Sequence, residues 1–289
     1  MTEPQFQDLD RFVAYADKQF DLLLLAGCFA DERQEPDVPS RAVGLSLLLG
    51  EVAQVPSLLQ LEEETQLPQW QRWVGYHGRI SHDTFGYTSN RMNPEQLGRA
   101  GRFINRKLKR GNAFEASKMH GLLVVSLDAN EQFCSDHRSG EECLSREVIC
   151  QDAQGNEVKK TQSYHKQVYA PLSGPRLSVI LDLEPMRPGE EECAAALRLL
   201  RRMRQTYGPR FFDMVVVDSW YTHGPFLKTV AKELGGPVVA VLKQERYAIY
   251  QEAMALTAGK PTQVVERGEG PSKRQVQIWD VPALRFSDT

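Results

Sequence analysis

The chain has 289 residues, which is enough for one large domain or two unequal ones. Hydrophobic residues make up 41% of it and charged residues 25%, a composition that excludes a disordered chain. The net charge of -3 excludes a protein that is basic throughout and leaves room for a local basic face. No apolar stretch approaches the roughly 20 residues of a membrane span, so we expect no membrane partner.

Cysteine usage and the N-terminal sequence indicate the compartment. An odd number of cysteines in a long chain is typical of a reducing environment rather than of a disulfide scaffold. The N-terminal residues MTEPQFQDLD are acidic and polar, unlike a signal peptide. We therefore expect a cytoplasmic protein with free thiols at Cys28, Cys134, Cys143, Cys150 and Cys193.

Residues 1–118 are predicted to form a helical N-terminal region. Apolar runs cover 22–30 and 43–55. Ser81 begins a further helix, and Asn93 begins another because an Asn cap is followed by Pro and then Glu in the first turn. We expect this last helix to continue through Leu108.

Residues 119–257 change to short apolar strands alternating with helices, the pattern of an α/β domain with a mixed sheet. Strands are expected at 122–127, 164–170, 177–183, 212–217 and 238–242, and helices at 190–207, 222–234 and 247–256. A polar loop is expected between the first two strands. Residues 258–289 are predicted as a separate stretch, in which 263–265 and 276–281 alternate like a β-hairpin.

Two aspartates carry the chemical signal. Asp128 follows the apolar run LLVVSL, and Asp218 follows FFDMVVV. Open α/β sheets place ligands beyond the carboxyl ends of their strands, so neighbouring strands would bring both carboxylates to one edge. Facing carboxylates attract divalent cations because a metal offsets their repulsion. The alternative is that each aspartate only caps the turn or helix that follows it.

Several blocks of the sequence, in order, resemble the DDE transposases of bacterial insertion sequences. The blocks are SHDTFGYTSNRM, VVSLDANEQF, SYHKQV, FFDMVVVDSWYTHGPFLKTV, VVAVLKQERYAIYQEA and QVQIWDV, and Asp128 and Asp218 stand 90 residues apart. The resemblance implies an RNase H-like core (119–257) behind a DNA-binding or dimerisation region (1–118), with the start of a β-rich insertion at 258–289. It also implies that Asp128 and Asp218 are catalytic and hold Mg²⁺ or Mn²⁺ for cleavage and transfer of DNA strands at the element's ends.

The chain departs from that family at the third acid, a glutamate on a helix after the β insertion. Only 71 residues follow Asp218, so this glutamate has no place in the sequence. Glu245 and Glu252 are internal substitutes, each open to the alternative of a solvated glutamate. We therefore expect a C-terminally truncated transposase of impaired activity. The rival hypothesis is a catalytically dead DNA-binding or dimerisation fragment that modulates a full-length transposase.

Basic residues gather just before the first strand. Residues 91–120 contain eight Lys or Arg and two Glu, a local charge of +6. Such a concentration favours contact with DNA phosphates, and its alternative is a solvated helix face. Lys166 lies on the second predicted strand, where the resemblance places it near the DNA backbone. The expected DNA-binding residues are Arg99, Arg102, Arg106, Lys107, Lys109, Arg110 and Lys166.

The loop after the first strand contains Cys134, His137, Cys143 and Cys150. Thiol and imidazole groups at such spacings are ligands that Zn²⁺ accepts. The resemblance implies a Cys-x-x-Cys pair here, as in many of the family's members, but Gly140 stands in place of its first cysteine. Free thiols remain the favoured reading of this loop.

Overall fold

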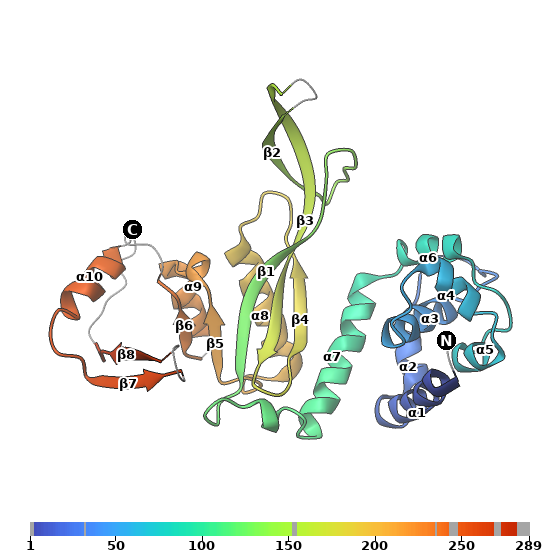
Figure 1. The fold of residues 1–289 in the computed structure, drawn as a ribbon, viewed down its shortest axis with the longest axis horizontal. Coiled ribbons are helices and arrows are strands. Elements are labelled where there is room, and N and C mark those ends of the chain that lie inside the picture. The colour runs from blue at the N-terminus through green and yellow to red at the C-terminus, as the bar shows by residue number, and fades with distance from the viewer. Residues whose placement is uncertain are drawn as a thin grey trace. The chain divides into compact units, whose positions relative to one another are not determined.

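The computed structural model describes residues 3–31, 33–151, 155–234, 236–242, 248–268 and 273–281. The chain divides into two compact units, Met1–Phe114 and Glu115–Thr289, which are called here the helical unit and the sheet unit (Figure 1). Within the described residues, no helix is both long enough and apolar enough to cross a bilayer.

The helical unit consists of short helices whose starts follow local capping rules. Asn93 accepts hydrogen bonds from the backbone of Glu95 and Gln96 at the start of one helix, and Ser81 accepts from the backbone of Thr84 at the start of another. Both predicted helix starts are therefore confirmed. The helices are α1 (Glu3–Phe20), α2 (Leu22–Ala26), α3 (Ser40–Val52), α4 (Leu58–Glu64), α5 (Pro68–Val74), α6 (His82–Ser89) and α7 (Pro94–Arg110).

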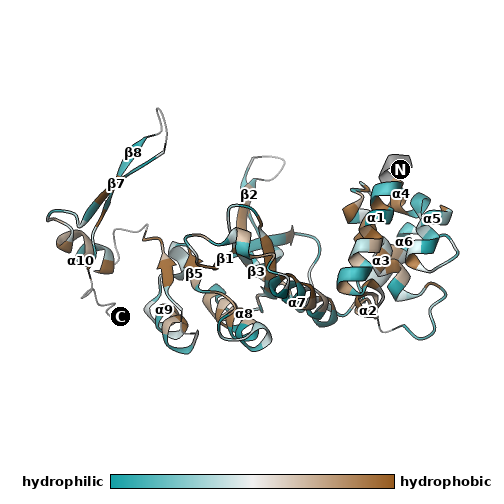
Figure 2. Cartoon of the chain, turned by 90° about the horizontal axis from the view of Figure 1, so that it is seen from below, coloured by the Kyte–Doolittle hydropathy of each residue, from teal (hydrophilic) through white to brown (hydrophobic). Residues whose placement is uncertain are grey.

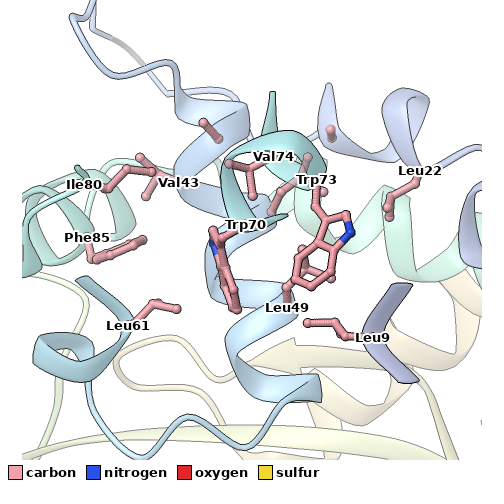
Figure 3. Close-up of a cluster of buried hydrophobic side chains, with 13 residues drawn as sticks. Leu9, Leu22, Val43, Leu49, Leu61, Trp70, Trp73, Val74, Ile80 and Phe85 are labelled. Atoms are coloured by element: carbon pink, nitrogen blue, oxygen red, sulfur yellow. The ribbon is translucent and has the colours of Figure 1, made fainter. Parts of the chain in front are cut away.

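Trp70 lies at the centre of the core of the helical unit. Its ring is fully buried, its Nε1 donates to Ser46 Oγ at 3.1 Å, and its centroid lies 5.9 Å from that of Trp73. Hydrophobic side chains from α1 to α6 and from the segment before α6 surround the two rings (Figure 3). They include Leu9, Leu22, Val43, Leu49, Leu61, Val74, Ile80 and Phe85.

A buried carboxylate joins α4 to the start of α6. Glu62 is almost completely buried, and its Oε2 accepts from the backbone N–H of His82 at 2.8 Å and lies 2.6 Å from His82 Nδ1. Its Oε1 forms an ion pair with Arg79. These hydrogen bonds, first of all the one from the His82 backbone, lower the pKa of Glu62 to about 2, and the hydrogen bond to Glu62 raises the pKa of His82.

This cluster predicts a stability maximum in mildly acidic solution. The contribution of Glu62 is present above its unfolded pKa of 4.5 and declines as the pH falls towards 2. The contribution of His82 is present below its unfolded pKa of 6.5 and declines as the pH rises through the higher folded value. Urea unfolding across this pH range should show both declines in the wild type and in the control Glu63→Gln. Glu62→Gln should flatten both, and a profile for that variant that parallels the wild type would contradict the assignment.

The sheet unit is built on a mixed sheet, in which both parallel and antiparallel strand pairs occur. β3 (Glu157–Ser173) pairs antiparallel with both β1 (Val124–Ser135) and β4 (Val179–Pro185). β5 (Met214–Val217) pairs parallel with β1 on one side and with β6 (Val238–Ala240) on the other. The resulting order, β4-β3-β1-β5-β6, confirms the predicted helical region followed by an α/β mixed sheet.

Helix α8 (Glu192–Tyr207) covers one face of this sheet (Figure 2). Its buried face presents Ala195, Leu199 and Met203 to a core that includes the buried strand residues Val125 and Val168. This burial follows from the apolar period of about 3.6 in the helix and the alternation in the strands.

Charged residues at the edge of the buried face of α8 fix the helix to β4. Arg202 Nε contacts Asp182 Oδ2 at 2.8 Å, and Arg202 also forms an ion pair with Glu184. Arg198 binds the same Glu184 and, in addition, Glu190. Both acids of β4 are nearly buried, so each needs these guanidinium partners in the folded state.

The prediction of a polar loop after the first strand is wrong, because most of these residues form a β-ribbon. β1 continues to Ser135, β2 (Leu144–Gln151) pairs with the first half of β3, and the ribbon stands out from the sheet in Figure 1. The ribbon carries polar residues on both faces, so its sequence lacks the apolar alternation by which strands are identified.

The segments that follow the sheet agree with the predicted order of elements. After β5 come the 3-10 turn η2 (Ser219–Tyr221), α9 (Gly224–Thr229) and a π-helical turn (Val230–Leu234). Beyond β6 lie α10 (Ala248–Leu256) and the predicted hairpin, which is formed by β7 (Gln263–Arg267) and β8 (Arg274–Ile278). The sheet unit begins with a 3-10 turn, η1 (Glu115–Ser117).

Candidate metal site and nucleic-acid surface

Asp128 and Asp218 occupy equivalent positions on two neighbouring parallel strands. The last paired residues of β1 and β5 are Leu127 and Val217, and each aspartate comes directly after one of them. Neighbouring strands lie about 4.8 Å apart, so the two residues leave the paired region side by side. Both side chains are exposed. This edge therefore concentrates two negative charges where solvent and ions have access.

Each aspartate also contacts the backbone through one carboxylate oxygen. Asp218 Oδ1 accepts from Trp220 N at 2.8 Å and so caps η2, and Asp128 Oδ1 accepts from Ala129 N at 2.9 Å. Asp218 thus has the capping role that was the alternative to metal binding. Its carboxylate is nevertheless exposed at the edge of the sheet.

Asp128 lies within a strand and not at its end, which corrects the sequence prediction. β1 continues for seven residues beyond Asp128, to Ser135, because β3 goes on pairing with it. Only the parallel pairing with β5 stops at Leu127, since β5 itself ends at Val217. The carboxyl edge at Asp128 is therefore formed by the end of β5.

The described residues provide no third acid at this edge. No three His, Cys, Asp or Glu side chains of the described part of the chain come together in a way that would hold a metal ion. Glu252 is an exposed residue of α10, and Glu245 lies outside the described residues.

The cysteine and histidine side chains of the ribbon do not form a described metal cluster either. Cys143 Sγ lies 3.4 Å from His165 Nε2, and Cys150 Sγ lies 3.6 Å from the carbonyl of Val158. Cys134 and His137 are exposed. The five cysteines are free thiols in this structure.

The basic residues of α7 differ in how far solvent reaches them. Arg99, Arg106 and Arg110 are exposed and, at spacings of seven and four residues, share one helix face. Lys107 is also exposed, and its ammonium group lies 5.5 Å from the centroid of the Phe103 ring. Lys109 is half-buried.

Arg102 does not lie on that exposed face. Its side chain is only 8% exposed, and its Nη2 contacts Glu95 Oε1 at 2.7 Å. The spacing of Arg99, Arg102 and Arg106 places all three on one side of the helix, but Arg102 lies at the border where α7 becomes buried. A guanidinium in this position stabilises α7 and is withdrawn from ligands in solvent.

Lys166 also has a partner within the protein. Its Nζ lies 2.6 Å from Oε2 of Glu192, the first residue of α8, and the Glu192 side chain is 8% exposed. Glu192 is a residue that the sequence analysis missed. The sequence signal that could have found it is the register of Lys166. Lys166 shares a strand face with the buried Val168 and Ala170, so its ammonium group points inward and requires an acidic partner.

Comparison with known proteins finds little at the level of sequence. No protein-family model and no curated protein matches the chain. Among solved structures it is similar to a piggyBac transposase in a synaptic complex with hairpin DNA, with a TM-score of 0.39 and 12% identity. The likeness covers 90% of this chain and 58% of the other, so the chain spans less than two thirds of that protein. A likeness at this level assigns no residue role.

Proposed function

We propose that the chain is a DNA strand-transfer protein of the DDE transposase type, which acts at the ends of an insertion sequence. Asp128 and Asp218 are its metal-binding residues. The observation that carries the proposal is the equivalent position of the two aspartates on neighbouring parallel strands. Two exposed carboxylates side by side repel each other, and a divalent cation relieves that repulsion. The sequence blocks around both aspartates, which resemble the transposase motifs, support the same assignment.

The two aspartates fit Mg²⁺ or Mn²⁺. Carboxylate oxygens are the ligands that these hard cations prefer, and Mg²⁺ is commonly held by one or two carboxylates together with water and substrate phosphates. A bound divalent cation supplies charge stabilisation to a phosphodiester under attack. The protein's part is to hold both carboxylates at a fixed edge of a rigid sheet, and the exposed face of α7 supplies positive charge for DNA phosphates.

A second function is favoured by the absence of a third acid from the metal edge in the described part of the chain. A pair of ligands holds the cation more weakly than three, so strand cleavage would be slow. A chain that binds DNA through α7 and does no chemistry would then act on a full-length transposase by competing for its DNA or by forming a dimer with it.

Calorimetric titration with Mn²⁺ tests the proposed site in the full chain. The wild type should bind Mn²⁺, and Asp128→Asn or Asp218→Asn should each weaken the affinity by at least about tenfold, which corresponds to roughly 1.4 kcal/mol. Glu147→Gln on β2, whose side chain is 72% exposed, is the matched control and should bind like the wild type.

The outcomes separate the two functions. Equal titrations for the wild type and both aspartate variants would remove the metal site and leave the non-catalytic function. Binding that depends on both aspartates, followed by Mn²⁺-dependent nicking of plasmid DNA that the same variants lack, would establish the enzyme.

A further inference from the structure

Trp220 is a large aromatic residue that stands exposed beside the proposed metal site. It lies two residues after Asp218, within η2, and it is 61% exposed. By contrast, Trp70 and Trp73 are buried in the helical unit, and Trp279 is half-buried. Among the described residues, the indole ring of Trp220 has no hydrogen bond and no ring contact. The ring is therefore open to a ligand that arrives from solvent.

The backbone around Trp220 is held in place from both sides. Asp218 Oδ1 accepts from Trp220 N at 2.8 Å, so the carboxylate proposed as a metal ligand also fixes the amide of Trp220. The carbonyl of Asp218 accepts from Tyr221 N at 3.3 Å. Tyr221 is completely buried, and its ring packs against Phe226 with the centroids 5.3 Å apart. The anchored turn therefore keeps the indole in solvent at a fixed place next to Asp218.

The ligand that fits an indole at this place is a nucleobase. Every base has a π-face, and stacking of bases on an aromatic side chain tolerates any sequence. Bases inside a duplex already stack on one another, so only an unpaired or terminal base offers a free face. A cationic side chain also binds an indole face, but a divalent cation on the two aspartates would repel it. The same cation attracts the phosphates of DNA, so a DNA strand is the favoured occupant.

We propose that Trp220 stacks on an unpaired or terminal base of the DNA strand that lies at Asp128 and Asp218, and thereby favours DNA ends with a single-stranded extension. The inference rests on the proposed function, because that function brings DNA to this edge of the sheet. It adds a substrate preference that the aspartates do not supply, since a cation held by carboxylates recognises phosphate and is blind to whether bases are paired.

Intrinsic fluorescence of the full chain, measured in Mg²⁺, tests the stack directly. A duplex with a short single-stranded extension should quench the wild type, because a stacked base takes up the excitation of the exposed indole. A blunt duplex of the same length should quench it much less. Trp220→Phe should abolish the quenching by the extended duplex, whereas the control Trp279→Phe should retain it.

Fluorescence anisotropy with the same two duplexes, now labelled, measures the effect on affinity. Trp220→Ala should weaken binding of the extended duplex about tenfold, which corresponds to the loss of one base stack, and should leave binding of the blunt duplex unchanged. Trp220→Phe keeps an aromatic ring and should retain most of the preference. Tyr15→Ala is the matched control, because Tyr15 is a 60% exposed aromatic residue of α1, and it should change neither affinity.

The outcomes decide between a base stack and other roles of Trp220. Equal affinity of the wild type and Trp220→Ala for the extended duplex would overturn the inference. An equal loss on both duplexes would also overturn it, because it would make Trp220 a general or structural contact. Quenching by a short lysine peptide and none by DNA would replace the base with a cationic ligand. A wild type that binds no Mn²⁺ in calorimetry would refute the proposed function, while the fluorescence titration would still decide whether Trp220 stacks on DNA.

Discussion

Replacement of the exposed basic residues of α7 is expected to weaken DNA binding about 100-fold at low salt and to flatten its salt dependence. The variant carries alanine at Arg99, Arg106, Lys107 and Arg110. Each phosphate contact releases counterions and contributes about 0.9 to the slope of log affinity against log salt, so four lost contacts reduce the slope by three to four. Fluorescence anisotropy with a short duplex of arbitrary sequence, titrated at several salt concentrations, measures both quantities.

The control for the α7 variant must carry the same change in net charge. Alanine at Arg11, Lys18, Arg41 and Lys232, all exposed and spread over other helices, provides it. This control should keep a slope close to that of the wild type. If both variants lose affinity equally, DNA responds only to overall charge and α7 is not the binding face. Arg102→Ala should lower the free energy of unfolding and leave the affinity for DNA nearly unchanged, because the Arg102 side chain is buried.

Trp70→Ala is expected to destabilise the helical unit by about 3–5 kcal/mol. The change removes a fully buried ring, leaves a cavity among the hydrophobic side chains of Figure 3 and deprives Ser46 Oγ of its 3.1 Å hydrogen bond. Since native domains are stable by roughly 5–15 kcal/mol, this loss is a large share of the total. Urea unfolding followed by far-ultraviolet circular dichroism measures it.

Leu59→Ala in α4 is the matched control for this prediction. Leu59 is 60% exposed, so its truncation should change the free energy of unfolding by no more than about 0.5 kcal/mol. Trp70→Ala should leave Mn²⁺ binding by the sheet unit intact, because the two units have separate cores. A loss below about 1 kcal/mol for Trp70→Ala would contradict the central place of this residue in the core.

The position of the two aspartates could be predicted because it depends on local pattern and one general rule. Short apolar runs identify β1 and β5, and the carboxyl ends of neighbouring parallel strands share an edge. The pattern of apolar residues could not predict which strand β1 pairs with beyond Asp128. The continuation of β1 past Asp128 is set by hydrogen bonds to β3, which is distant in sequence and polar where it pairs.

Charged residues show a second limit to prediction from sequence. Arg102 and Lys166 were both expected to face DNA, and in the structure both carry ion pairs with acids, Glu95 and Glu192. Nothing local distinguishes an inward arginine on a basic helix from an outward one, since burial depends on what packs against that face. The inward direction of Lys166 could be predicted because it shares a strand face with buried residues. Its partner Glu192 could not, because Glu192 belongs to α8.

The parallel pairing of β1 with β5 has a consequence for how the site comes into being. Val124 pairs with Met214, 90 positions away, whereas the ribbon pairing of Ser135 with Ser163 spans only 28. Contacts at larger separation close a longer loop and form later in folding. At a synthesis rate of about 5–20 residues per second, roughly 5–18 s separate the emergence of the two aspartates from the ribosome. The antiparallel part of the sheet can therefore fold before the residues of β5 exist, and the two carboxylates come together only after β5 has been synthesised.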